Sequence, residues 1–232
     1  MPKQMYSIQQ AVAEIVADKE QCFLYAKRLA NSRKFRMAVK NLDRHRTDVY
    51  FKPVTWKSKR DNDFLILLGV SSKKDAKTNG MFLTIAMLFS FEGVLHAATF
   101  GDIGYSTRVD IFKYHFFKRY NERFLKQPEL DIKDVIGIFI RSNPHCCCRK
   151  METKKFQNSY AFLYPDGVGF GNYYPEKKYC ILNTFVTRMM LFKNQSEMVK
   201  DLKEYVDNIS AKSWAEIRDV NNVTYPNCNV MR

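Results

Sequence analysis

Apolar residues recur at helical spacing over the first thirty positions of the chain. They fall on one side of a predicted helix: Val12, Ile15, Val16, Cys22, Phe23 and Leu29. Ser7 and Gln10, at the start of this pattern, fit an N-terminal capping box, in which the two side chains satisfy free backbone N–H groups. Asn31-Ser32 is expected to end this helix, and a second, basic helix is predicted to follow.

In the next part of the chain the pattern changes to apolar runs separated by turn residues. The runs cover 64–70, 81–91 and 94–100, and the turn signals between them are Thr78-Asn79-Gly80 and Gly93. Apolar runs bounded by turn residues are typical of buried β-strands. The sequence therefore predicts a strand-rich block here.

Two helices and a β-meander are predicted for the second half of the chain. A long helix is expected from about 107 to 126, and another from the capping residue Asp131 to a break at Pro144. Three short strands joined by two tight turns are then predicted to form a meander. They cover 160–164, 168–174 and 179–187. The stretch 196–220 returns to a helical pattern.

These elements indicate an α+β fold, in which an antiparallel sheet or meander packs with helices and a basic helical region precedes it. A boundary is expected near Arg60. It divides the chain into a basic N-terminal helical region, 1–60, and an α+β domain, 61–232. One domain overall is the alternative.

The composition excludes several classes of protein. The 232 residues include 9 Gly and 7 Pro and are 46% hydrophobic, so a collagen-like, low-complexity or disordered chain is not expected. The longest apolar runs are shorter than the ~18–20 residues of a membrane-spanning helix, and the first ten residues lack the apolar stretch of a secretory signal. Three of the six cysteines are consecutive, which does not fit a secreted disulfide framework. We therefore expect a cytoplasmic protein with no membrane partner.

Positive charge is concentrated in residues 27–60. This segment has twelve Lys and Arg against two acids, Asp43 and Asp48, in a chain whose formal net charge is +14. Basic side chains neutralise phosphates, and aromatic rings set between them can stack on unpaired bases. We therefore predict contact with nucleic acid, RNA rather than DNA, through seven residues: Arg33, Lys34, Arg36, Lys40, Arg44, Arg46 and Trp56.

Other interpretations of this basic segment remain open. Charge runs are usually solvated faces, and Phe35, Met37, Val39 and Leu42 fit a helix that packs its apolar side on a core. An acidic protein partner or inhibitor would also suit a basic surface, and a basic amphipathic helix can bind a membrane surface.

The stretch 114–124 has the densest set of residues suited to catalysis. Four of them share one side of the predicted helix because of their spacing: His115, Arg119, Glu122 and Arg123. A His can exchange a proton near neutral pH, and guanidinium groups can bind phosphate and stabilise charge that develops in a transition state. These groups suffice for metal-independent RNA cleavage, in which the substrate's 2′-hydroxyl is the nucleophile. The alternative is an Arg–Glu ion-pair network that covers the sheet.

Five short stretches follow one another between residues 105 and 187: Tyr105-Ser106, H-F-F-K-R-Y-N-E-R, Asp134-Val135-Ile136, Gly167-Val168 and C-I-L-N-T-F-V-T. Their order resembles the layout of the barnase/EndoU/colicin/RelE-like nucleases, especially the small toxin and phage-borne branches. In those nucleases a helix with a His and an Arg packs on a C-terminal antiparallel meander. For this chain the resemblance implies His115 as general base or acid, Arg119 and Arg123 as phosphate ligands, and Thr184 as a polar contact to the scissile group.

Other motifs give less support to a function. Pro165-Asp166 and Glu176-Lys177-Lys178 spell the motif of metal-dependent nucleases, but a strand between them would hold the two acids about 30 Å apart. His145-Cys146-Cys147-Cys148 has no second ligand pair at the spacing of a zinc site. The chain contains no P-loop, HExxH, G-x-G-x-x-G or G-x-S-x-G motif. No metal or cofactor is expected.

The sequence thus predicts a cytoplasmic RNA-binding protein. The residues around His115 make a metal-independent ribonuclease of toxin or mobile-element type the leading form of this hypothesis. The alternative is a non-catalytic module that binds nucleic acid or an acidic protein.

Overall fold

The computed structural model describes residues 2–42, 47–73, 81–103, 106–144, 146–151 and 158–191. Several sequence predictions fall outside these residues: the nucleic-acid contacts of Arg44 and Arg46, the turn at 78–80 and the helix at 196–220.

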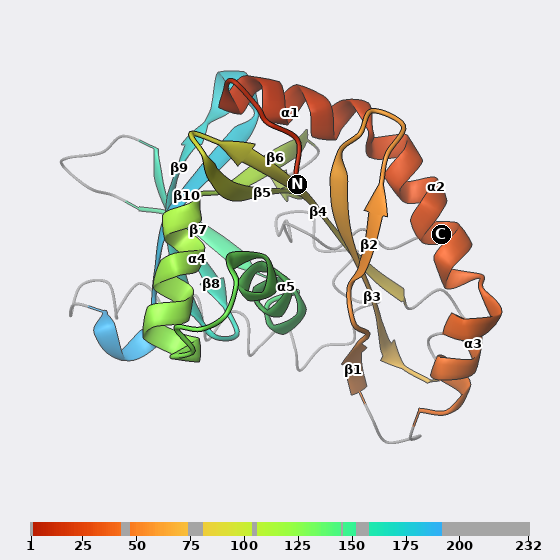
Figure 1. The fold of residues 1–232 in the computed structure, drawn as a ribbon. Coiled ribbons are helices and arrows are strands. Elements are labelled where there is room, and N and C mark those ends of the chain that lie inside the picture. The colour runs from red at the N-terminus through yellow and green to blue at the C-terminus, as the bar shows by residue number, and fades with distance from the viewer. Residues whose placement is uncertain are drawn as a thin grey trace.

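One mixed sheet of ten strands runs through the described part of the chain (Figure 1). The strands are β1 (Thr47–Tyr50), β2 (Val54–Lys57), β3 (Asp63–Ser72), β4 (Met81–Phe91), β5 (Val94–Ile103), β6 (Ser106–Phe112), β7 (Cys147–Lys150), β8 (Ser159–Tyr164), β9 (Gly167–Tyr174) and β10 (Tyr179–Val186). Their order is β1-β3-β4-β5-β6-β10-β9-β8-β7, and β2 also pairs with β3. Every pair is antiparallel except β6 with β10, which is parallel. The predicted α+β class with a mostly antiparallel sheet is confirmed.

Two groups of strands agree with the sequence pattern. Strands β3, β4 and β5 form the predicted strand-rich block, and β8, β9 and β10 form the predicted meander. Glu92 and Gly93 make the turn between β4 and β5, with φ angles of 53° and 75°. Consecutive positive φ values match the right-handed twist of a hairpin, and glycine adopts them without strain.

Three helices cover one face of the sheet (Figure 1). They are α1 (Ile8–Ala17), α2 (Lys19–Ala30) and α3 (Arg33–Lys40). The Ser7 hydroxyl accepts from the Gln10 N–H at 3.1 Å and so caps α1, as predicted. The expected break comes at Asn31-Ser32, where the Ser32 hydroxyl caps α3 by accepting from the Phe35 N–H at 3.2 Å.

The first sixty residues share a core with the strands that follow them. Alternate residues of β3, among them Phe64, Ile66 and Leu68, join buried side chains of α1 and α2 in one apolar cluster. Strands β1 and β2 pair directly with β3. The helices of the predicted basic region therefore pack on the sheet, and its strands β1 and β2 belong to the sheet.

Two further helices and a π turn cover the other face. They are α4 (Tyr114–Tyr120), η2 (Asn121–Leu125) and α5 (Ile132–Ser142), and short 3₁₀ turns lie at Pro175–Lys177 (η3) and Arg188–Met190 (η4). Leu65 and Leu67 of β3 point to this side and join a second cluster with Phe116 and Phe139. Asp131 caps α5 as predicted, accepting from the Lys133 N–H at 2.7 Å, and α5 ends before Pro144.

The helix predicted from 107 to 126 is wrong in its first part. Residues 106–112 are strand β6, which pairs with β5 and β10, and α4 begins only at Tyr114. Val109 and Ile111 point into the first core, while Arg108 and Asp110 are buried toward the other face. Arg108 and Asp110 look like surface residues in the sequence, but in the structure they form a buried ion pair.

The strands after β6 curl back over it. Strands β6 and β8 are three places apart in the sheet, which is about 14 Å in a flat sheet, yet the Arg108 guanidinium lies 5.1 Å from the Phe162 ring on β8. Gly171 on β9 helps this close packing, because a Cβ there would strike the Ile181 carbonyl of β10. None of the helices in the described ranges is long and apolar enough to span a membrane.

Candidate nucleic-acid interface

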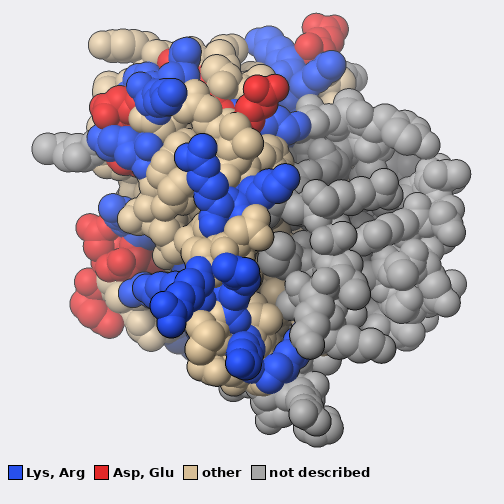
Figure 2. Space-filling view, turned by 90° about the vertical axis from the view of Figure 1, so that its right-hand side faces the viewer, with Lys and Arg blue, Asp and Glu red and all other residues tan. Residues whose placement is uncertain are grey.

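Lys and Arg side chains lie along the outer face of α2 and α3, in groups separated by other residues (Figure 2). Six of them are exposed, and we call them the helical basic face: Lys27, Arg28, Arg33, Lys34, Arg36 and Lys40. None of the six has an ion pair or hydrogen bond from its side chain to another described residue. Both helices are described throughout, and Glu20 is the one exposed acid on them.

Local sequence explains why these cations point outward. Cys22, Ala26 and Ala30 are buried along the inner side of α2, where small side chains let the helix lie close to the sheet. On α3 the inner side is held by Phe35, which is buried and packs on the Phe51 ring with centroids 4.8 Å apart. The apolar side of each helix faces the core, so the Lys and Arg side chains on the opposite side are exposed to solvent.

The charges on α3 do not stabilise that helix. Arg33 and Arg36 are three residues apart, and Arg36 and Lys40 are four apart, so like charges are neighbours on its surface. Each such pair is unfavourable by about 0.2–0.5 kcal/mol. Arg33 and Lys34 also lie in the first turn, where the helix dipole disfavours cations. An external polyanion would relieve both effects.

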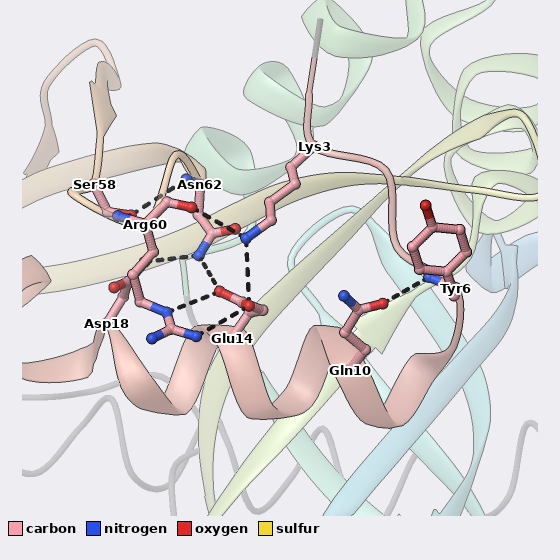
Figure 3. Close-up of polar contacts among 8 residues, drawn as sticks. All are labelled: Lys3, Tyr6, Gln10, Glu14, Asp18, Ser58, Arg60 and Asn62. Carbon is pink, nitrogen blue, oxygen red and sulfur yellow. Dashed lines mark hydrogen bonds and ion pairs between the residues drawn. The ribbon is translucent and has the colours of Figure 1, made fainter.

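A buried acid holds the helical layer to the sheet (Figure 3). Glu14 of α1 receives two hydrogen bonds from the Arg60 guanidinium, at 3.0 and 3.1 Å, and one from the Asn62 side-chain amide at 2.8 Å. The Lys3 ammonium lies 3.3 Å from the same carboxylate, and Asn62 also donates to Asp18 at 2.8 Å. These contacts, led by Arg60, lower the pKa of Glu14 to about 2. The cluster joins α1 to the loop between β2 and β3.

Some cations of the predicted basic segment therefore form ion pairs with acids of the same chain. Arg60 pairs with Glu14, and Lys57 pairs with Asp61 at 2.9 Å. Trp56, predicted as a nucleic-acid contact, packs on the rings of Tyr25 and Phe64, with centroids 5.0 and 5.5 Å away.

Four of the five candidate catalytic residues lie on α4 and the π turn, on the opposite face of the sheet. His115 is exposed. Arg119 forms an ion pair with Glu122 at 3.0 Å. Arg123 donates to the Phe185 carbonyl of β10 at 2.6 Å, and its burial, together with Arg119, lowers its pKa. The structure thus brings Arg119 and Glu122 together, as the ion-pair alternative expects.

Thr184 is separated from this group by the sheet. It lies opposite Phe170 of β9, which belongs to a small apolar cluster with Val168 and Val186. Its neighbour Phe185 points the other way, into the core under α4. Adjacent strand residues face opposite sides, so Thr184 points away from α4. The contact that the resemblance implies for Thr184 is not supported by this placement.

The two acids of the metal-nuclease motif lie at opposite ends of β9, and His145 of the His-Cys motif lies outside the residues that the structure describes. Asp166 accepts from the Tyr120 hydroxyl at 2.7 Å and the Asn143 side-chain amide at 2.8 Å, and β9 separates it from Glu176. Cys146 is buried, and burial raises the pKa of Cys148. In the described ranges no group of three or more His, Cys, Asp or Glu side chains is placed to hold a metal ion.

Sequence reasoning missed a buried charge pair in the curl of the sheet. Arg108 and Asp110 are 1% and 0% exposed, and an Arg108 guanidinium nitrogen donates to the Asp110 carboxylate at 3.1 Å. A second nitrogen lies 3.6 Å from the Cys148 sulfur. Alternation of the charged Arg108 and Asp110 with the apolar Val109 and Ile111 was the available signal for a strand, although by itself it indicates a strand with one polar face.

The comparisons with known proteins leave the function to be argued from this geometry. The chain matched no protein-family model, no curated protein and no solved structure.

Proposed function

We propose that this protein binds nucleic acid through the phosphate backbone, using the helical basic face. The proposal is carried by one observation, that six exposed cations on two adjoining helices have no partner among the described residues. Arg and Lys at such positions neutralise phosphates and release condensed counterions, which drives association without regard to sequence.

The packing of the aromatic residues supports recognition by charge. Phe35 is buried, and Trp56 packs on Tyr25 and Phe64 beneath the helices. Binding modes that depend on stacking need rings free to meet the bases. We therefore expect most of the affinity to be electrostatic and steeply dependent on salt.

A salt series on a labelled RNA tests the proposal. With up to six phosphate contacts, the plot of log K against log salt should have a slope near −4 for a single strand. Replacing Arg33, Lys34, Arg36 and Lys40 together by Gln should reduce the slope by about 3. A DNA strand of the same sequence, measured in parallel, tests the predicted preference for RNA.

The matched control removes the same charge elsewhere. Lys133, Arg141, Lys150 and Lys177 are exposed and lie away from α2 and α3. Their replacement by Gln should leave the slope nearly unchanged. Affinity that is insensitive to salt, or equal losses in the two variants, would refute the helical basic face as the binding surface.

A ribonuclease function is the second candidate, and the exposure of His115 beside Arg119 on α4 favours it. A residue that transfers a proton to substrate must be accessible to it. Incubation of the same RNA in excess EDTA distinguishes the two functions. Cleavage by the wild type but not by His115→Ala would establish the metal-independent nuclease, whereas a salt-sensitive shift without cleavage leaves the binding function alone.

A further inference from the structure

A pocket of about 520 Å³ opens beside α4, on the face of the sheet opposite the helical basic face. It lies between α4, the π turn η2 and the loop that leads to α5. Tyr114, Leu130 and Ile132 form its apolar part, and Lys118 and Lys126 contribute two ammonium groups. Its volume falls in the range of about 300–1,000 Å³ that is usual for small-molecule sites.

Hydrogen bonds at the end of the π turn give this pocket a defined shape. The Asn121 side chain donates to the Gln127 carbonyl at 2.8 Å and accepts from the Gln127 N–H at 3.1 Å. The Lys126 N–H donates to the Asn121 carbonyl at 2.7 Å, and Lys126 is in the left-handed region with φ 57°. These hydrogen bonds fix this wall of the pocket before a ligand binds, so binding costs less conformational entropy. Turns of π-helix are often found at functional sites.

The charges around the pocket favour an anion. Glu122 is the acid in the lining, and it lies 3.0 Å from Arg119 but 4.0 Å from Lys118. Because Arg119 is its nearer partner, the carboxylate neutralises Lys118 only in part. Lys126 has no ion pair or hydrogen bond from its ammonium group to a described residue. Two ammonium groups next to an apolar wall suit a ligand with a flat ring and an anionic group.

We infer that this pocket binds a nucleoside monophosphate, with the base against Tyr114 and the apolar wall and the phosphate on Lys118 and Lys126. The same chemistry is present in a free nucleotide and in the phosphorylated end of a nucleic-acid strand. The inference does not depend on the helical basic face, because no residue of that face lines the pocket.

Calorimetric titration of the full-length protein tests this site. The probes are AMP, adenosine and ribose 5-phosphate, each titrated separately. AMP should bind about tenfold more tightly than either fragment, since only AMP uses both parts of the pocket. Lys118→Ala and Lys126→Ala should each weaken AMP binding by about tenfold, as expected for loss of a charge-assisted contact. Lys133→Ala, an exposed lysine outside the pocket, should leave it unchanged.

The source of the ligand is decided with a 5′-phosphorylated trinucleotide in competition with AMP. Tighter binding of the trinucleotide assigns the pocket to strand ends, and tighter binding of AMP assigns it to free nucleotide. The variant with four Gln residues on α3 should still bind AMP, so the two proposals can fail separately. Absence of AMP binding at millimolar concentration, equal affinity for adenosine, or indifference to both lysine variants would overturn the inference.

Discussion

Replacement of Glu14 by Gln is the sharpest test of how the helical layer is held. Glu14 is 9% exposed and accepts hydrogen bonds from Arg60 and Asn62, with Lys3 at 3.3 Å. Gln keeps the size of the side chain but removes the charge. It also replaces one acceptor oxygen, which faces these donors, by an NH2 group that can only donate. We expect the free energy of unfolding to fall.

The size of the loss follows from the pKa of the carboxyl. The cluster lowers the pKa of Glu14 from 4.5 to about 2, and at roughly 1.36 kcal/mol per unit this corresponds to about 3 kcal/mol at neutral pH. The Arg60 side chain is 49% exposed, so solvent screening reduces the figure to about 2 kcal/mol. For a chain of this size the expected decrease in Tm is about 4–8 °C.

The sign of the pH dependence is determined by the direction of the shift. Because the pKa of Glu14 is lower in the folded state, its contribution is present above the unfolded value of about 4.5. The contribution is lost as the pH falls toward about 2. The difference between wild type and Glu14→Gln should therefore be largest at pH 6–7 and shrink below about pH 4.5.

Urea unfolding of the two proteins at several pH values measures this difference. Glu20→Gln is the matched control, because Glu20 is an exposed acid on the next helix and surface charges contribute about 0–1 kcal/mol. A difference for Glu14→Gln that stays constant between pH 7 and pH 3 would contradict the assignment to the Glu14 charge. A loss no larger than that of Glu20→Gln would refute the proposed role of the cluster.

Two further changes test the curled part of the sheet by urea unfolding at neutral pH. Asp110→Asn leaves the buried Arg108 guanidinium without its counter-charge and should cost about 3–5 kcal/mol; wild-type stability in this variant would count against the pair. Gly171→Ala puts a Cβ against the Ile181 carbonyl and should cost about 1–3 kcal/mol. Gly137→Ala on α5, with nothing within 4 Å of the new Cβ, should instead be neutral or stabilising by up to about 1 kcal/mol.

Local signals predicted the parts of the fold that depend on neighbouring residues. Ser7 and Asp131 cap the helices that they were expected to cap, and the turn at Gly93 joins two predicted strands. Capping and turn formation involve residues within a few positions of one another, so the sequence pattern contains the necessary information.

The wrong prediction for β6 has a non-local cause. Arg108 and Asp110 look like surface residues until β5 and β10 pair on either side and β8 covers them. The curl that makes this possible depends on strands more than fifty residues later in the chain. The same limitation applies to Thr184, whose side of the sheet follows from an irregularity in the pairing of β10 with β9 between Leu182 and Thr184.

The basic segment was predicted as a unit, but the structure divides it into two kinds of cation. Lys57 and Arg60, beside β2, have partners, since Lys57 is 2.9 Å from Asp61 and Arg60 is 3.0 Å from Glu14. Those on α2 and α3 have none among the described residues. A charge excess needed only for solubility would be served by any exposed position, and spacing the cations apart on α3 would avoid like-charge neighbours.

Concentrating the unpaired cations on one helical face has a cost in folding stability and a benefit only when a polyanion is present. Stability and binding should therefore respond in opposite directions to their removal. The variant with Gln at Arg33, Lys34, Arg36 and Lys40 loses adverse i,i+3 and i,i+4 pairs and adverse charge at the start of α3. We expect it to unfold at the same or a higher urea concentration than the wild type while it binds RNA more weakly. A variant that lost both stability and RNA binding would show that these side chains serve the fold.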